Sequence, residues 1–225
     1  FMRDTIKPKD YFLKRIQNDT ARIKKFEETL KNTEPSNERG IRIGKSQLSK
    51  LFLDCAKASY SMGADLEEVY SYYVQSINHY KDACTPADSL FGVIDYLSIG
   101  VLFHKSKQEF LAALETIATK FNSQDGLICC LLHYLQDKPL EMQQSKLGYF
   151  NDLTKCDDKL AVLSSELSHW YQHHKSASWY NSHKSKNNTY CGYWCFEIAA
   201  LSKIFGIDDK DFALNPYYPY DLAHY

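Results

Sequence analysis

Apolar residues recur at every third or fourth position along most of the chain, and this helical spacing limits the possible folds more than any other feature of the sequence. The first stripe runs from Phe12 to Leu30 and predicts an amphipathic helix over residues 9–31, which the polar segment around Pro35 brings to an end. Residues 89–104 are apolar on nearly every side, which predicts a central, buried helix. No convincing alternation of apolar and polar residues, the pattern of a strand, is found. The chain is therefore expected to be all-α.

The remaining stripes extend this interpretation to a multi-helix bundle of about nine antiparallel helices joined by short loops, with no substantial sheet. They cover residues 48–58, 66–80, 110–121, 127–135, 160–170 and 190–205. The longest stretch without a helical period is 137–158. It divides the chain into an N-terminal helical part, residues 1–138, and a C-terminal helical part, residues 139–225, which we expect to share one core.

The composition is that of a soluble globular protein, with 44% hydrophobic and 24% charged residues. No apolar run approaches the roughly 20 residues that cross a bilayer, so no membrane association is expected. The first residues lack the apolar stretch of a secretory signal. The seven cysteines are odd in number and include the adjacent pair Cys129 and Cys130, which favours reduced, packed thiols over a disulfide framework. From the first residues and from the cysteines we expect a cytoplasmic location.

The net charge of −1 hides an uneven distribution. Residues 1–57 contain 14 Lys and Arg against 8 Asp and Glu, a net charge of +6, and residues 58–225 contain 13 against 20, a net charge of −7. In the basic segment the two signs alternate, as on the solvated face of a surface helix, and no aromatic residues accompany a basic stripe. Direct nucleic-acid binding is therefore not expected. The acidic remainder suits a basic partner.

Motifs that carry catalysis or bind phosphate are incomplete or absent. Residues 40–46 resemble a phosphate-binding loop, but one spacer between the glycines is missing and a polar loop, not a strand, precedes them. A turn in which Ser46 caps the next helix is the favoured interpretation. No nucleophile elbow and no zinc-protease helix occur. We expect no catalytic residue and no cofactor.

Two pairs of potential metal ligands have the spacing of one helical turn. They are His169 with His173 and Cys191 with Cys195, which together could supply tetrahedral zinc. Such spacing is common by chance, so no metal site is expected. The alternative to a binding protein is a helical metal-dependent enzyme, and its candidate residues are Glu197, His183, Asp208 and Asp209.

The last fifty residues concentrate tyrosines and tryptophans, which bury a large area and carry a polar tip. The helix expected over 190–205 would place Tyr190, Trp194 and Glu197 together, ending at Gly206. If Glu197 is buried there it needs hydrogen-bond donors, and the tyrosines and histidine near the C-terminus are the natural ones. We favour a structural lock, in which the tail 216–222 folds back over this helix, over a ligand pocket.

The same segment resembles a known family. The motifs are Trp179-Tyr180-x-x-His183, Tyr190-x-Gly192-Tyr193-Trp194-x-Phe196-Glu197, Ile207-Asp208-Asp209 and Tyr217-Tyr218-Pro219-Tyr220-Asp221-Leu222. They resemble the C-terminal domain of PoNi-type immunity proteins, bacterial antidotes to polymorphic nuclease effectors that contact-dependent systems such as type VI secretion deliver. The N-terminal half resembles the accompanying domain through Ala58-Ser59-Tyr60-Ser61-x-Gly63. The resemblance implies an all-helical, non-enzymatic protein that binds and blocks a cognate DNase toxin.

The resemblance and the charge together define the expected site residues. Carboxylates that could stand in for DNA phosphates on the basic surface of the toxin are Asp65, Glu67, Glu68, Asp157, Asp158, Asp208, Asp209 and Asp211. The competing explanation for each is stabilisation of a helix N-terminus. Motif residues expected to maintain the fold are Trp179, His183, Tyr190, Gly192, Tyr193, Trp194, Glu197, Tyr218, Pro219 and Asp221. The protein is expected to be a monomer or a weak homodimer.

Overall fold

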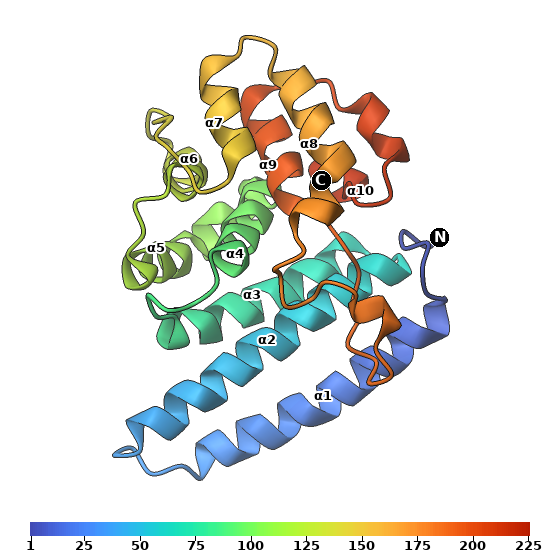
Figure 1. Cartoon of the computed structure of the whole chain (residues 1–225). Helices are drawn as coiled ribbons and strands as arrows, with labels where there is room; N and C mark the ends of the chain where they lie inside the picture. Colours follow the sequence, from blue (N-terminus) through green and yellow to red (C-terminus); the bar gives the residue numbers. More distant parts are fainter. The chain divides into compact units, whose positions relative to one another are not determined.

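The computed structural model describes residues 1–225 and contains helices without any strand. Ten α-helices and three short 3-10 helices are present, and nine of the α-helices have eight or more residues, which confirms the expected all-α fold (Figure 1). In chain order they are α1 (Lys9–Lys31), α2 (Glu38–Met62), α3 (Leu66–Ala83), α4 (Leu90–Leu102), η1 (His104–Glu109), α5 (Leu111–Phe121), α6 (Gly126–Leu135), α7 (Gly148–Lys155), α8 (Lys159–His173), η2 (Ser182–Lys184), α9 (Phe196–Phe205), η3 (Lys210–Leu214) and α10 (Tyr220–Ala223). None of them combines the length and apolar character that a membrane span requires.

The residues group into two compact units. Unit 1 consists of Phe1–Cys84 and Asn181–Gly192, and unit 2 consists of Thr85–Tyr180 and Tyr193–Tyr225. A short segment late in the chain therefore belongs with the first three helices. The expected division into residues 1–138 and 139–225, with one shared core, stays a prediction.

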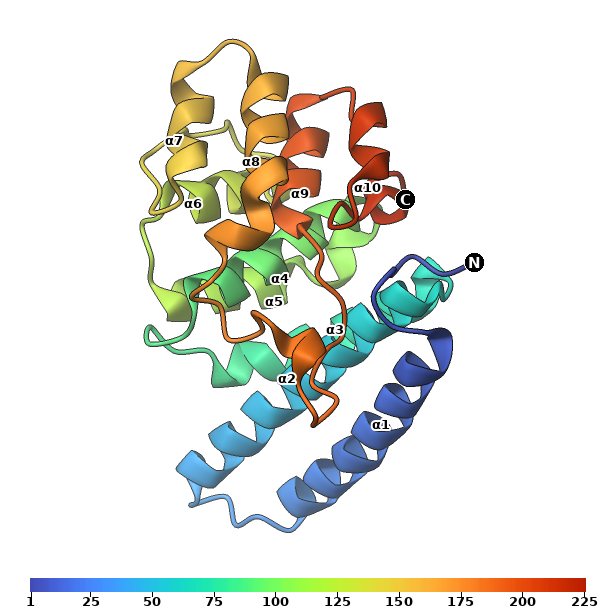
Figure 2. The same ribbon diagram turned by 45° about the vertical axis from the view of Figure 1, so that its right-hand side comes forward.

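In unit 1, α2 packs against both α1 and α3 (Figures 1 and 2). The apolar stripes meet in a core of five buried residues, Ile23, Leu48, Leu51, Phe52 and Cys55. A side-chain hydrogen bond and a glycine define the two ends of α2. The Asn37 side chain accepts a hydrogen bond from the Gly40 amide and so caps α2, and Gly63, at φ 88°, ends the same helix in the left-handed conformation.

The prediction of a turn at residues 40–46, with Ser46 as the cap of the next helix, is wrong. These residues lie inside α2, and the cap of α2 is Asn37. The reason lies in the packing of α2 against α1. A Cβ atom on Gly44 would stand 2.7 Å from the Leu30 side chain, so the glycine allows the two helices to approach closely. The two glycines that suggested a phosphate loop are therefore helical residues.

In unit 2, α4 is the central helix, as its sequence predicts, and it packs against α5, α6 and α9. Helix α7 falls in the stretch that has no helical period, and its eight residues contribute three buried side chains, Tyr149, Phe150 and Leu153. A helix of about two turns is too short for an apolar period to be recognised in the sequence. In the next helix, Leu160 is 42% exposed although the predicted stripe would bury it.

The helix expected over residues 190–205 begins only at Phe196. Gly192 adopts φ 113°, a conformation that interrupts any helix at this point. Tyr190, Tyr193 and Trp194 therefore precede α9 and do not share a helix with Glu197. The tail does return as expected, because the Cys195 amide donates to the Tyr217 carbonyl oxygen at 2.7 Å and α10 packs on α9.

Candidate functional site

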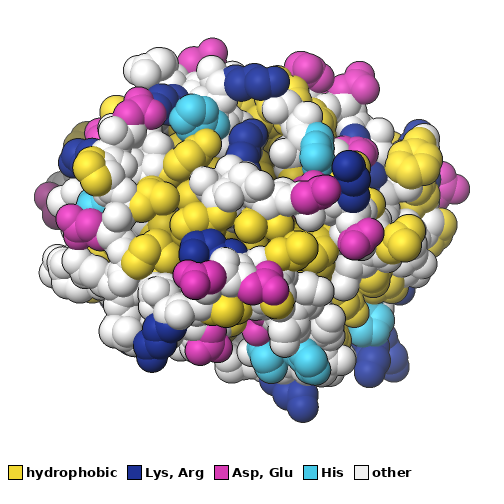
Figure 3. All heavy atoms as spheres, turned by 90° about the horizontal axis from the view of Figure 1, so that it is seen from above, with side chains coloured by type: hydrophobic (Ala, Val, Ile, Leu, Met, Phe, Trp, Pro, Cys, Tyr) yellow, Lys and Arg dark blue, Asp and Glu magenta, His cyan; other side chains and the backbone are white.

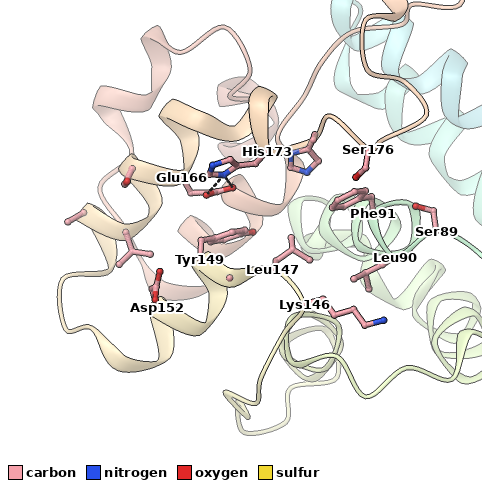
Figure 4. Close-up of a pocket in the computed structure, with 15 residues that line it drawn as sticks. Ser89, Leu90, Phe91, Lys146, Leu147, Tyr149, Asp152, Glu166, His173 and Ser176 are labelled. Carbon is pink, nitrogen blue, oxygen red and sulfur yellow. Dashed lines mark hydrogen bonds and ion pairs between the residues drawn. The ribbon is translucent and has the colours of Figure 1, made fainter.

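Unit 2 contains a groove between the beginning of α4, the beginning of α7 and one side of α8. Its volume is about 1030 Å³. Phe91, Leu147 and Val162 give it apolar walls. The Glu166 carboxylate and the His173 ring lie together on one side of it (Figure 4). We call it the α4–α7–α8 groove. Apolar walls with a few polar groups are the usual composition of a binding site.

Glu166 and Tyr149 are buried and carry polar groups in the lining of this groove, as does His174. The Glu166 side chain is 9% exposed, and its two oxygens lie 3.0 and 3.1 Å from Nδ1 of His173. The Tyr149 side chain lies beside Glu166, and its buried hydroxyl has no hydrogen-bond partner (Figure 4). Burial raises the pKa of the Tyr149 hydroxyl well above its ordinary value, and nearby acidic groups, Glu166 among them, add to the rise. The hydroxyl is therefore neutral and able to donate.

Glu197 is buried elsewhere in unit 2, and its hydrogen-bond donor differs from the expected one. Trp170 donates from Nε1 to Oε1 of Glu197 at 2.7 Å, and Nε2 of His174 stands 3.7 Å from the same oxygen. Trp170 belongs to α8 and His174 is the C-terminal cap of α8, so neither residue comes from the C-terminal tail. Burial raises the pKa of the Glu197 carboxyl, His174 opposes the rise and Asp95 adds to it. This carboxylate is part of the core.

The tyrosine and histidine of the tail bind Asp209 instead. The Tyr218 hydroxyl donates to Oδ2 of Asp209 at 2.6 Å, and Nε2 of His224 lies 2.9 Å from Oδ1. Burial raises the pKa of the Tyr218 hydroxyl, and the bond to Asp209 raises it further. Asp209 is 6% exposed. It ties the C-terminus to the loop after α9, and its side chain does not cap η3.

Segment 181–192 is held in unit 1 by a buried arginine that the sequence reading missed. Arg15 donates to the carbonyl oxygens of Asn188 at 2.7 Å and Tyr190 at 3.4 Å. The same guanidinium pairs with Asp19 at 3.0 Å and Asp54 at 2.8 Å. The signal was present, because Arg15 and Asp19 follow Phe12 at helical spacing on the apolar face of α1.

The other motif residues have mostly packing roles. In unit 1, Tyr190 also donates from its hydroxyl to Asp4, and the His183 ring meets the Tyr190 ring edge-on. In unit 2, the Trp179 ring stacks on that of Trp170 at 5.3 Å. Buried motif residues are Tyr190, Tyr193, Trp194, Glu197, Tyr218 and Pro219, whereas Asp221 is exposed.

Seven of the eight acidic residues expected to contact a partner are exposed, and Asp209 is the exception. In unit 1, Asp65, Glu67 and Glu68 lie at the beginning of α3. In unit 2, Asp157 and Asp158 precede α8, and Asp208 and Asp211 flank the start of η3. An Asp158 oxygen accepts from the Ala161 amide at 3.0 Å, so this residue also caps its helix. None of these carboxylates lines the α4–α7–α8 groove.

The two units differ in charge. Unit 1 contains 17 Lys and Arg against 12 Asp and Glu, a net charge of +5, and unit 2 contains 10 against 16, a net charge of −6. Figure 3 shows that one face of the molecule exposes hydrophobic side chains in its middle, with charged side chains of both signs around them. On the face that this view shows, acidic and basic side chains are mixed, and the acidity of unit 2 is a net excess of carboxylates over the whole unit.

The potential metal ligands do not form a site. No group of three or more His, Cys, Asp or Glu side chains is placed to hold a metal ion. His169 and His173 stack ring on ring along α8, but Cys191 and Cys195 lie on no helix, because α9 begins after them. All seven cysteines are free thiols.

Comparison with known families covers most of the chain. Residues 3–114 match the N-terminal domain model of the PoNe immunity proteins (PoNi), and residues 123–222 match the C-terminal domain model of the same proteins. Searches among curated proteins and among solved structures find no significant match. The resemblance seen in the aromatic motifs is thereby confirmed. The chain belongs to the family of PoNe immunity proteins.

Proposed function

We propose that this protein binds the nuclease toxin encoded beside it and neutralises it in the cytoplasm, without catalytic activity of its own. The observation that carries the proposal is the match of both halves of the chain to the two domains of one immunity family. A binding role also agrees with the buried carboxylates. Glu197 accepts a hydrogen bond from Trp170, and Asp209 is bonded to Tyr218 and His224, all inside unit 2.

Charge supports occlusion as the mode of inhibition. A DNase holds a polyanion and therefore presents a basic surface. Unit 2, at −6, has the opposite sign, and opposed charges speed the encounter of two proteins. The proposed contacts are the exposed carboxylates of Asp65, Glu67, Glu68, Asp157, Asp158, Asp208 and Asp211. Asp209 leaves this set, because Tyr218 and His224 already occupy its oxygens.

Co-purification tests the proposal. The chain and a catalytically inactivated form of the toxin from the adjacent gene are expressed together, with a tag on one partner alone. We expect a stable complex, with one toxin bound to a monomer or weak homodimer of this protein. DNA cleavage by the active toxin should then stop when the protein is added in excess. Cleavage that continues in the presence of saturating protein would refute the proposed function.

A further inference from the structure

The α4–α7–α8 groove has the chemistry to hold a positively charged side chain. We propose that it receives a lysine or arginine of the toxin, together with the apolar residue next to it. This inference rests on the proposed function, because it names the toxin as the occupant. It adds the groove, as a specific contact site, to the exposed carboxylates already proposed to contact the toxin.

The first argument is the state of the Glu166 carboxylate. Its sole hydrogen-bond partner is the His173 ring, and a carboxylate can accept about four hydrogen bonds. A buried carboxylate with so few partners is costly to keep in the free protein. His173 is the last residue of α8 and its side chain is 56% exposed, so its ring can turn into solvent and leave the carboxylate to an incoming cation.

The second argument is the composition of the walls. Phe91, Leu147 and Val162 are partly buried and come from three separate segments. Lysine and arginine place their aliphatic stems along such surfaces while the charged end reaches an acceptor. Tyr149 adds a buried hydroxyl without a partner on the same side of the groove as Glu166 (Figure 4). A guanidinium has enough donors to serve more than one acceptor.

The third argument is the balance of charge around the groove. Glu166 and Asp152 carry negative charge there, against the positive charge of Lys146. The whole unit has a net charge of −6. A basic segment is therefore favoured over an acidic one, and a DNA-cleaving toxin is a natural source of basic side chains.

Two serines of α8 provide a matched test. Ser165 lines the groove and Ser164 does not, and both are exposed. Ser165→Trp fills the groove, whereas Ser164→Trp adds the same bulk outside it. The affinity for the inactivated toxin should fall about tenfold or more for Ser165→Trp, and stay within about twofold for Ser164→Trp. Glu166→Gln removes the charge at constant size and should weaken binding about tenfold. Far-UV circular dichroism shows whether each variant is folded.

The identity of the occupant is tested by cross-linking. A photoreactive benzoylphenylalanine at position 165, in complex with the inactivated toxin, should attach to a toxin peptide that contains a lysine or arginine beside an apolar residue. A cross-link to a peptide without a basic residue, or to a second copy of this protein, overturns the inference. So does equal affinity of Ser165→Trp and Ser164→Trp, and in that case the proposed function still stands. Failure of the wild-type protein to bind the toxin refutes both.

Discussion

Replacing Arg15 with methionine should destabilise unit 1 by about 3–5 kcal/mol, because it leaves a buried charge without its partner. The Arg15 side chain is 8% exposed and that of Asp19 is 5% exposed, and they are 3.0 Å apart. Methionine retains part of the volume of the arginine side chain but provides no hydrogen-bond donor. The remaining cation near Asp19 is Arg22, at 3.7 Å and 56% exposed, which compensates little. Segment 181–192 also loses the bond to the Asn188 carbonyl.

Asp54, the second carboxylate that pairs with Arg15, limits the loss of stability. Asp54 keeps Lys50 at 2.8 Å when Arg15 is removed, so the main cost comes from Asp19 and from the freed segment. The matched control is Arg22→Met, which removes the exposed arginine that stands 3.7 Å from Asp19 and should cost about 0.5 kcal/mol or less.

Urea denaturation followed by far-UV circular dichroism measures both variants, because helices of unit 1 contribute directly to that signal. Tryptophan fluorescence is unsuitable, since all three tryptophans belong to unit 2. A free energy of unfolding for Arg15→Met within about 1 kcal/mol of the wild type would refute the reasoning, because a buried carboxylate would then tolerate the loss of its partner.

Three further predictions concern unit 2. The pKa of Glu197 is raised by burial, so its contribution to stability is full below the ordinary value of 4.5 and is lost as pH rises through the higher native pKa. Glu197→Gln should therefore gain in melting temperature relative to the wild type as the pH rises above 4.5, and a constant difference would contradict this. Tyr149→Phe removes a hydroxyl that has no partner, so the free protein should melt at the same temperature or higher, and a loss above about 1 kcal/mol would reveal a bond absent from the structure. Asp157→Lys combined with Asp211→Lys should slow toxin association several-fold at low salt, with a smaller effect at high salt, in stopped-flow measurements. Equal association rates at low salt would argue against electrostatic attraction.

Helices with a long apolar stripe and clear end signals could be predicted from the sequence. Helix α1 has the predicted bounds, and Gly206 ends α9 as expected. The start of α9 was predicted too early, because the aromatic residues before it match the helical spacing by chance while Gly192 breaks the helix. Amphipathic spacing reports which side chains can share a face, but it does not report the backbone conformation of a single glycine.

The candidate site could not be predicted in the same way. The α4–α7–α8 groove draws on three separate segments, and none of them carries a motif. Glu166 looks like an ordinary helix carboxylate until packing buries it beside Tyr149. The aromatic motifs indicated the family but not the groove, because most of their residues are buried within their own unit. Buried pairs on an apolar stripe, such as Arg15 with Asp19, are the one polar feature that the spacing could have predicted.

A titration of toxin activity is the most direct measurement of the central claim. A fixed amount of the neighbouring nuclease is mixed with increasing amounts of this protein, and the initial rate of DNA cleavage is recorded. The account predicts that the rate falls linearly and reaches zero when the two proteins are equimolar. Loss of activity at a small fraction of that amount would show that the protein acts as a catalyst, and a rate that stays constant beyond equimolar protein would show that it does not neutralise this toxin.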